Sequence, residues 1–551
     1  MIKDLYNKLF KYEEKESYNF ILPNSSNNID EKEFNKEDSE VVSSSLKENL
    51  EYLKVKYNML INNDIKIRDF SLNIQGKKFS SILLYIDGMV SSKDINDYVL
   101  QPLLLKNSIR MKESKELTNS EKVKFNLENF LYSGLIPQNS VSKETDFKKI
   151  ISKVNSGFCV LFVDSISTAL CVEVKGYPTR SISKPITEEV VKGSHVGFVE
   201  DLRTNTSMIR KIINNEKLII EELTIGNLNK TKVAICYLNH ITNDDLISEI
   251  KYRLNNLKID YILSSGQLEQ FIKDDCKTAF PQSISTERPD KSCNYLMLGR
   301  VVVLVNGSPF SIILPASLID FLTSPEDFNL NYHYSNFLRI LRAVALACAL
   351  LVPGMYVAIT MFHYELIPSE LLFAIVASRE AIPFPIIFEI IIMEICFELI
   401  QEASIRVPSS FSTTVGIIGA LILGDAAISA NIVSPILIII VAFSGICAFT
   451  IPDNTLRSAI RMFRFMYIVL GYISGFLGIA LGFFIHFLIL ANQSSFGVPF
   501  FTPYIPYNSI SENDNLFMNP VWKREKRNKV LNTKKPNLEE HISMKWRKNG
   551  K

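Results

Sequence analysis

The sequence has few of the residues and motifs that usually mark a reactive site. Its 551 residues include two tryptophans, six histidines and eight cysteines, and the cysteines never form a C-x-x-C pair. It contains no G-x-x-x-x-G-K-[ST] loop, no H-E-x-x-H motif and no G-x-S-x-G motif, so the common P-loop, zinc-peptidase and serine-hydrolase signatures are absent. The scattered cysteines predict buried thiols in a reducing compartment. We therefore expect no catalytic residues, no cofactor and no metal.

The N-terminus also lacks a secretion signal, because MIKDLYNKLFKYEEKES has no apolar core and no small-residue cleavage site. Charged and apolar residues are mixed up to about residue 340, whereas long apolar runs with short polar breaks fill residues 343–491. Hydrophobic residues make up 47% of the chain and its mean hydropathy is +0.12, which is high for a soluble protein. The pattern predicts a cytosolic α+β region followed by a polytopic α-helical membrane domain.

Two stretches of the first half have a weak echo later in the chain. KKFSSILLYIDGMVSSKDIND (77–97) resembles KTKVAICYLNHITNDDLISE (230–249), because each has a buried-strand pattern, a turn and an acidic helix start. GFCVLFVDSISTALCVEVKG (157–176) resembles GRVVVLVNGSPFSIILPAS (299–317), because each has two β-rich runs around a turn. The echo predicts two related α/β subdomains.

Shifts in composition suggest where these parts begin and end. A polar, aromatic-poor N-terminal segment predicts disorder, and a Pro/Ser/Thr cluster predicts a linker between the subdomains. The expected parts are a disordered segment at 1–45, subdomains at 46–180 and 199–335, a linker at 181–198, a transmembrane domain at 336–495 and a basic tail at 496–551.

The membrane domain contains five apolar stretches. Basic residues before the first and last stretches favour the cytoplasmic side, and eleven Lys/Arg against three Glu in 521–551 favour it for the tail, which would meet anionic lipid headgroups or water and not nucleic acid. Five simple crossings would instead put the tail outside, so either one stretch does not cross or the tail breaks the rule. The expected spans are 343–362, 367–405 (broken, and the best candidate not to cross), 415–433, 436–451 and 465–491.

The broken stretch contains four glutamates in the run FEIIIMEICFELIQEASIR. At about 100° per residue, Glu394, Glu398, Glu402 and Arg406 lie on one row of a helix, while Glu389 points elsewhere. Carboxylates that face lipid are costly. Three interpretations remain open: an amphipathic helix on the membrane surface, ion pairs with a neighbouring helix or subunit, or a carboxylate-lined cation path.

The run SREAIPFP (378–385) precedes these glutamates. Its prolines break a helix, and broken helices at membrane depth need protein or a water-filled cavity to receive the freed backbone groups. This favours a hinge or binding element, with a plain extramembrane turn as the alternative. The candidate hinge residues are Arg379, Glu380, Pro383 and Pro385.

Small residues mark two further stretches as close-packing helices. In 415–433 they lie beside Asp425, which predicts a pore-facing or tightly packed helix; with no second intramembrane aspartate, aspartyl protease chemistry is excluded. In 465–491 two G-x-x-x-G motifs share one face and predict helix packing. The small residues are Gly416, Gly419, Ala420 and Gly424 in the first stretch, and Gly471, Gly475, Gly478 and Gly482 in the second.

Several longer motifs, in order, carry a resemblance to a known family over about residues 70–520. The chain resembles the A subunit of GerA-type spore germinant receptors. Two departures from that family's pattern are Gly193-Ser194-His195-Val196-Gly197-Phe198 in place of a Gly-Pro-basic-Glu-Gly-Phe run, and Asp425 in place of a frequent glutamine. The motifs are TERPDK (286–291), GRVVVLVNGSPF (299–310), SPEDF (324–328), SREAIPFP (378–385), FELIQEASIRVP (397–408), FTIPDNTLRSAIRMFRF (449–465) and SFGVPF (495–500).

The resemblance implies a receptor subunit in the spore inner membrane that responds to nutrients. It implies a transporter-like B subunit and a lipoprotein C subunit as partners, self-association, and a ligand-gated ion channel whose opening starts germination. It also implies a cytosolic N-terminal region built from two subdomains. The alternatives are a secondary transporter with its site at the broken helix and a non-conducting membrane scaffold.

Overall fold

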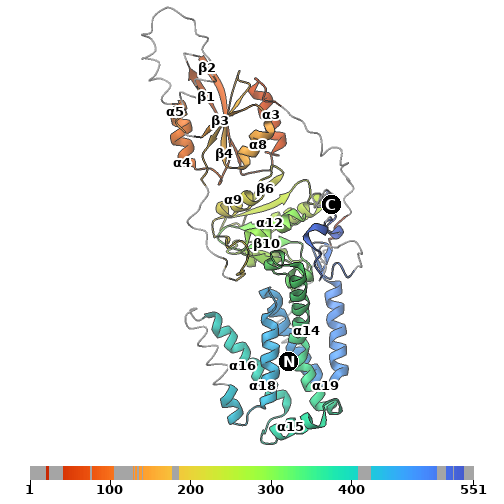
Figure 1. Ribbon diagram of the computed structural model, residues 1–551. Helices are drawn as coiled ribbons and strands as arrows, with labels where there is room; N and C mark the ends of the chain where they lie inside the picture. Colours follow the sequence, from red (N-terminus) through yellow and green to blue (C-terminus); the bar gives the residue numbers. More distant parts are fainter. Residues whose placement is uncertain are drawn as a thin grey trace, which may run out of the picture.

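The computed structural model shows two stacked α/β units above a bundle of long helices (Figure 1). We call residues 41–176 subdomain 1, residues 187–198 the linker, residues 199–331 subdomain 2 and residues 332–492 the helical half. Residues 517–538, the C-terminal segment, lie against subdomain 2. The structure describes residues 20–23, 41–74, 77–104, 128, 131–132, 136–138, 140–176, 185, 187–406, 424–505, 517–524 and 526–538.

Subdomain 1 is an antiparallel five-stranded sheet between two helical layers, with strand order β1-β2-β4-β5-β3. Its central strand β4 (Phe158–Val163) is almost wholly apolar and buried, as expected for a strand covered on both faces. One apolar core lies under α3 and α8, and a separate one lies under η1 and α5. The other elements are α3 (Leu46–Lys56), β1 (Ile65–Ile74), β2 (Lys77–Ile86), α4 (Ser92–Asp94), η1 (Ile95–Leu100), α5 (Gln101–Leu104), β3 (Val141–Glu144), α8 (Phe147–Asn155) and β5 (Ala169–Glu173).

Subdomain 2 repeats this plan. Its strand order is β6-β7-β9-β10-β8, and every neighbouring pair is antiparallel. The stretches that echo each other in the sequence form equivalent strands, β2 with β7 and the hairpin β4-β5 with β9-β10, so the predicted repeat is present in the fold. The elements are α9 (Leu202–Ile212), β6 (Leu218–Ile225), β7 (Thr231–Leu238), α10 (Asp244–Asn255), α11 (Ser265–Ile272), β8 (Ile284–Thr286), α12 (Pro289–Met297), β9 (Val301–Val305), β10 (Ser311–Leu314), α13 (Leu318–Leu322) and η4 (Pro325–Phe328).

The helical half hangs below subdomain 2 (Figure 1). Helix α14 and the whole apolar run Asn454–Asn492, labelled α19, are long and apolar enough by length and composition to cross a membrane. Many apolar side chains on this half are exposed, among them Ile439, Ile446 and Leu477, at 65 to 67%. Its surface is therefore more apolar than the surface of a typical soluble protein. Its helices are α14 (Tyr332–Phe362), η5 (Tyr364–Leu366), α15 (Ser369–Arg379), α16 (Ile386–Arg406), α18 (Pro435–Phe449) and α19 (Asn454–Asn492).

Helix α19 is a hairpin, which corrects the expectation of one span over 465–491. At Gly475 the backbone leaves the helical region (φ 59°, ψ −139°), a conformation that glycine adopts without a steric penalty. The rings of Tyr467 and His486 are 6.0 Å apart, whereas nineteen residues of continuous helix would separate them by about 28 Å. The two legs, 454–474 and 476–492, therefore lie side by side.

The hairpin brings the end of the helical half back to its start. Helix α14 begins directly after η4 of subdomain 2, and at the end of α19 the ring of His486 lies 5.1 Å from that of Phe280 in subdomain 2. The two ends of the helical half, near residues 332 and 492, therefore lie at the same end of the bundle. Five simple crossings would have placed them at opposite ends. The C-terminal segment lies on the same side as both subdomains.

One apolar core crosses the boundary between subdomain 2 and the helical half. It includes Phe321 of α13, Ala349 of α14 and Leu456 of α19. The cores of subdomain 1 contain residues of that subdomain alone. By apolar packing, subdomain 2 and the helical half form one body, to which subdomain 1 is attached.

Two expectations fall partly outside the described residues. Most of the expected disordered segment 1–45 is not described, but Phe20–Pro23 packs against the C-terminal segment, where Asn532 donates to the carbonyls of Leu22 and Pro23. Leu22 is only 6% exposed, so this short stretch corrects the expectation. In the expected span 415–433, Gly416, Gly419 and Ala420 lie outside the described residues.

Candidate functional site at the junction of sheet and helices

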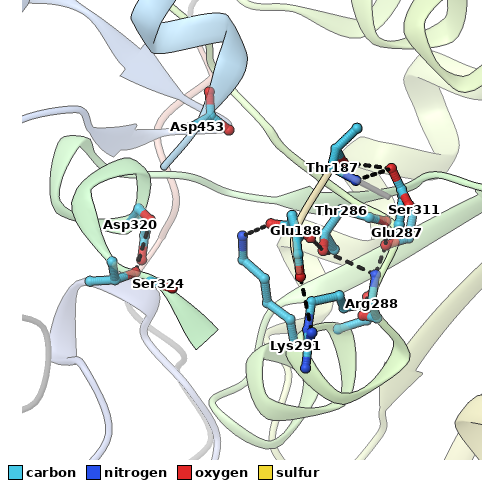
Figure 2. A network of polar contacts seen from close by, with 12 residues as sticks. Thr187, Glu188, Thr286, Glu287, Arg288, Lys291, Ser311, Asp320, Ser324 and Asp453 are labelled. Atoms are coloured by element: carbon cyan, nitrogen blue, oxygen red, sulfur yellow. Dashed lines mark hydrogen bonds and ion pairs between the residues drawn. The ribbon is translucent and has the colours of Figure 1, made fainter. Parts of the chain in front are cut away.

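A buried arginine fixes the chain that joins the two subdomains. Arg288, from the motif TERPDK, is fully buried and lies just before α12. Its guanidinium donates to the carbonyls of Glu188 (3.1 Å) and Ser194 (2.9 Å) and pairs with Asp290 (2.7 Å). Because one planar group binds carbonyls at two places, it fastens residues 188–194 to subdomain 2 (Figure 2).

The side chains around Arg288 extend this clamp. The carboxylate of Glu188 pairs with Nζ of Lys291 (2.6 Å) and accepts a hydrogen bond from Thr286. The hydroxyl of Thr187 donates to Glu287 at 2.5 Å. Figure 2 shows these residues converging from the linker and from the turn before α12. The motif TERPDK therefore positions the linker and presents no free catalytic pair.

A second buried pair holds the end of the subdomain 2 sheet. Arg300 donates to both carboxylate oxygens of Asp320, at 2.7 and 3.0 Å. Asp320 also accepts from the backbone and hydroxyl of Ser317 (both 2.7 Å), which caps α13. Both partners of the ion pair are more than 90% buried. The bidentate geometry fixes α13 to the start of β9, which directly follows Arg300.

A third pair ties the first turns of α14 to subdomain 2. Asp327, from the motif SPEDF, is fully buried and binds Arg339 (3.2 Å) and Arg342 (2.7 Å). The carbonyl of the same aspartate accepts from Ser335 (2.8 Å). The two arginines before the first expected span thus form the root of α14. A movement of η4 would be transmitted directly to this helix.

Aromatic rings fill the space beside these pairs. Phe280 of subdomain 2 stacks on Phe463 of α19 at 5.1 Å and lies 6.3 Å from Phe500 of the motif SFGVPF. Phe500 in turn lies 6.0 Å from Phe321. Large buried aromatics contribute most of the apolar stabilisation at such contacts. We call this cluster, with the three arginine sites above, the junction.

Within the helical half, the glutamate row of α16 faces the first leg of α19. Glu394 and Arg464 are both fully buried and lie 2.8 Å apart. Glu398 binds Arg461 at 2.8 Å and Arg464 at 3.4 Å. Gln401 also contacts Arg461. Glu394 and Glu398 of the expected row therefore have their partners on a second helix.

The other two glutamates of α16 also have arginine partners in the same chain. Glu402 pairs with Arg406 one turn away at 2.6 Å, and both are exposed. Glu389 is fully buried, binds Arg379 at 3.1 Å and accepts from the backbone N–H of Ser434 at 3.2 Å. The interpretation as ion pairs with a neighbouring helix describes this arrangement for Glu394 and Glu398. Each of the four glutamates of α16 therefore has an arginine beside it, which differs from a path lined by carboxylates alone.

The run SREAIPFP lies where α15 ends and α16 begins. Arg379 is the last residue of α15, and its pair with Glu389 spans the break. Glu380, Pro383 and Pro385 are exposed in the turn. The ion pair between Arg379 and Glu389 thus bridges the break. Of the residues expected to form a hinge, only Arg379 makes this contact.

Close backbone contacts hold α14 against α19 and the two legs of α19 against each other. A Cβ at Gly471 would lie 2.6 Å from the carbonyl oxygen of Gly354, and one at Gly354 would lie 2.6 Å from that of Tyr467. A Cβ at Gly478 would lie 2.2 Å from the carbonyl of Leu470, inside the hairpin, and Gly482 packs beside it. The predicted packing glycines thus form two contacts, one within α19 and one against α14.

The remaining expected pore residues are separated from this packing. Gly424 is buried at the start of a short helical turn, yet a Cβ added to it would meet no described atom within 4 Å. Asp425 next to it is exposed. Gly424 lines one pocket together with Phe397 and Gln401 of α16.

Comparison with known proteins decides the family. Residues 51–530 match the model of the Bacillus/Clostridium GerA spore germination protein family. The chain belongs to this family. Spore germination protein KA of Bacillus subtilis is 36% identical over 89% of this chain and 88% of that protein, and the uncharacterized membrane protein YfkQ of the same species is 37% identical over 88% and 91%. The N-terminal domain of the A subunit of the Bacillus megaterium spore germinant receptor GerK3 is 31% identical, covers 50% of this chain and 96% of its own, and has a TM-score of 0.37.

In this GerA-family chain the motifs of the resemblance fall at two places. TERPDK, GRVVVLVNGSPF, SPEDF and SFGVPF supply the junction, while the other three supply the ion pairs of the helical half. Sequence reasoning missed Gly354 and the partner roles of Arg461 and Arg464. The spacing of Arg457, Arg461 and Arg464 was the available signal. Arg461 and Arg464 lie about one helical turn apart, as Glu398 and Glu394 do, so an antiparallel helix can pair the two sets.

Proposed function

We propose that this GerA-family chain is the A subunit of a nutrient receptor in the spore inner membrane. Family membership over most of its length carries the proposal, because the family and the relative KA are named for spore germination. In this proposal the helical half spans the membrane and both subdomains are cytosolic. The positive-inside rule supports that orientation, since Arg339, Arg342, Arg457 and Arg461 all lie toward the subdomain 2 end of the bundle.

We further propose that copies of the chain associate and form a nutrient-gated ion channel, together with a transporter-like B subunit and a lipoprotein C subunit. The glutamates of α16 are neutralised within one chain, so we assign the pore to the stretch 415–433 and not to that row. The exposed carboxylate of Asp425 would then attract cations. In this view the paired glutamates hold the helices that surround the pore.

The junction is the proposed route from nutrient binding to the helices. The buried sites at Arg288, Arg300 and Asp327 bind the linker, the subdomain 2 sheet and the root of α14, respectively. Asn329, directly after η4, donates to the carbonyl of Lys192 in the linker at 3.0 Å. In this proposal a shift of the linker is passed to η4 and, through Asp327, to α14. Removing one partner would uncouple the two ends.

Spores provide the direct test of the receptor role. Spores whose nutrient receptor genes are deleted, except for the set that includes this chain, are exposed to amino acids, sugars and nucleosides, and germination and ion release are followed. We expect a response that disappears when this chain alone is removed and returns when it is restored. An unchanged response to every nutrient without the chain would contradict the proposal.

The channel step has its own test. We expect the purified receptor in liposomes to conduct cations, and the change Asp425→Asn to lower the preference for cations over anions. The matched control Glu402→Gln, at an exposed pair, should leave it unchanged. An equal preference for cations over anions in both variants would contradict the assignment of the pore to 415–433.

A further inference from the structure

A cavity of about 450 Å³ lies where subdomain 2, the root of α14 and the C-terminal segment meet. Its size is within the range of small-molecule sites, about 300 to 1,000 Å³. The walls come from the end of α12, the turn after β7, α13, η4, α14 and residues 524–538. The contacts described above for the junction motifs do not account for the presence of this cavity.

The charged side chains of the cavity are mostly cationic. Among the described residues that line it are three arginines, Arg339, Arg524 and Arg527, and one carboxylate, Asp320. That carboxylate is already held by both arms of the Arg300 guanidinium. Arg339 is likewise held by a carboxylate, that of Asp327. The positive charge that remains for the cavity includes that of Arg527, and burial makes such a charge costly unless an anion compensates it.

Arg527 shows this charge most directly. It is 6% exposed, and it donates to the carbonyl oxygens of Met297 (2.8 Å), Lys535 (3.0 Å) and Asn537 (2.5 Å). Carbonyls orient a guanidinium but supply no formal negative charge. Burial accordingly lowers the pKa of Arg527 to about 10.

The environment of His240 indicates the same potential. Burial, followed by the charges of Lys217, Arg527, Lys535 and Lys534, lowers the pKa of His240 to about 4. At neutral pH its imidazole is therefore uncharged. A neutral imidazole beside several cations is a polar wall that adds no positive charge of its own.

The remaining walls suit an apolar or aromatic body. Phe328 has the guanidinium carbon of Arg524 5.3 Å from its ring centroid and that of Arg339 6.0 Å away, so the ring holds both groups in place. Leu238 and Ile319 add apolar side chains to the lining. A planar guanidinium fixed in this way is suited to bind a carboxylate or phosphate through two hydrogen bonds.

We propose that this cavity binds a small organic anion, with its carboxylate or phosphate group at Arg524 and Arg527 and its apolar body against Leu238 and Ile319. Because α14 and the C-terminal segment each supply a wall, the bound anion joins them to subdomain 2. The proposal goes beyond the receptor role and does not depend on it. A free metabolite and the headgroup of an anionic lipid share this chemistry.

Fluorine NMR of 4-fluorobenzoate with the full chain in zwitterionic lipid nanodiscs tests the site. The uncharged 4-fluorobenzyl alcohol is the matched probe. In Arg524→Gln we expect the dissociation constant for the benzoate to rise by at least about tenfold, the effect of losing one charge-assisted hydrogen bond. The control Lys529→Gln, an exposed charge on the same segment, should leave it unchanged. Equal affinities of the alcohol and the benzoate would overturn the proposal.

A second variant fills the cavity without changing its charge. Asn294→Trp on α12, one of the lining positions, should abolish benzoate binding while the melting temperature stays close to that of the wild type. Benzoate binding that survives in both Asn294→Trp and Arg524→Gln would contradict the site. Two competition experiments with the wild type distinguish the sources of the anion. If anionic lipid in the nanodisc displaces benzoate, the ligand is a lipid headgroup. If phenyl phosphate displaces benzoate in zwitterionic nanodiscs, the ligand is a soluble anion.

Discussion

The two subdomains have the same strand order but are joined to the rest of the molecule in different ways. Subdomain 2 shares an apolar core with the helical half, whereas subdomain 1 keeps its cores to itself and meets subdomain 2 through polar contacts. Asp64 binds the fully buried Arg210 at 2.8 Å, and the backbone N–H of Asn63 donates to the carbonyl of Ile220 at 3.1 Å. Apolar burial is proportional to area and non-directional, whereas an ion pair needs one geometry.

This difference implies different freedom of movement. A shared core resists separation at every point, so subdomain 2 and the helical half should open together. A joint made of a few directional polar bonds opens when those bonds break. Subdomain 1 is thus the part of the molecule able to change its position while the rest keeps its fold.

The largest expected effect compares one buried aromatic from each of the two regions. Phe280→Ala at the junction and Phe162→Ala in subdomain 1 each remove a buried ring and should each lower the free energy of unfolding by about 3 to 5 kcal/mol. Phe280→Ala should destabilise subdomain 2 and the helical half together, and Phe162→Ala subdomain 1 alone. Limited proteolysis of each variant with increasing denaturant would show which regions are cleaved.

Breaking the buried pair in the helical half should have a similar cost. Arg464→Ala leaves Glu394 fully buried without its partner and should destabilise the helical half by about 3 to 5 kcal/mol. The matched variant Arg406→Ala removes an exposed pair and should cost about 1 kcal/mol or less. Thermal unfolding in nanodiscs measures both. Equal shifts would mean that the Glu394 site is hydrated and not the closed pair described above.

The polar joint between the subdomains should be sensitive to one residue. Arg210→Ala leaves Asp64 without its partner and should cost about 3 kcal/mol or more at the joint. Hydrogen exchange should rise around residues 62–64 and 218–220 but not in the helical half. Arg203→Ala, at the exposed pair with Asp87, serves as the control. Faster exchange throughout the helical half in Arg210→Ala would contradict a separable joint.

The smallest effect concerns pH. The pKa of His240 is about 4 in the folded chain, against about 6.5 in an unfolded one. Between these values the unfolded state binds more protons, so stability rises with pH from about 4 to 6.5 and is lost on acidification through that window. His240→Phe should remove this part of the acid sensitivity of subdomain 2. A melting temperature with the same pH slope in wild type and variant would show that His240 is not the group responsible.

Part of this fold could be predicted because the signals are local. Apolar, β-rich runs around turns predicted the equivalent strands, and i+4 spacing predicted the row of Glu394, Glu398 and Glu402. The partner of Glu394 lies at Arg464, on another helix, and no periodicity of α16 points to it. Non-local pairing depends on how the helices are connected, which spacing within one helix does not contain.

The hairpin of α19 shows the same limit in a different way. Residues 465–491 form an apolar run long enough for one span, and its glycines fit a packing face. The chain reverses direction at Gly475 because its φ is positive, and Gly478 then packs closely against Leu470 of the first leg. That conformation depends on the contact with α14, so the sequence pattern alone favours a straight helix.

Hydrogen exchange of the full chain in lipid nanodiscs, followed by mass spectrometry at increasing denaturant, tests the central claim most directly. The two joints predict two opening events. Amides of β2, β4 and β5 in subdomain 1 should open together at a lower denaturant concentration, and those of β7, β9, α14 and α19 should open together at a higher one. Opening of β7 and β9 together with subdomain 1, while α14 and α19 stay protected, would contradict the shared core.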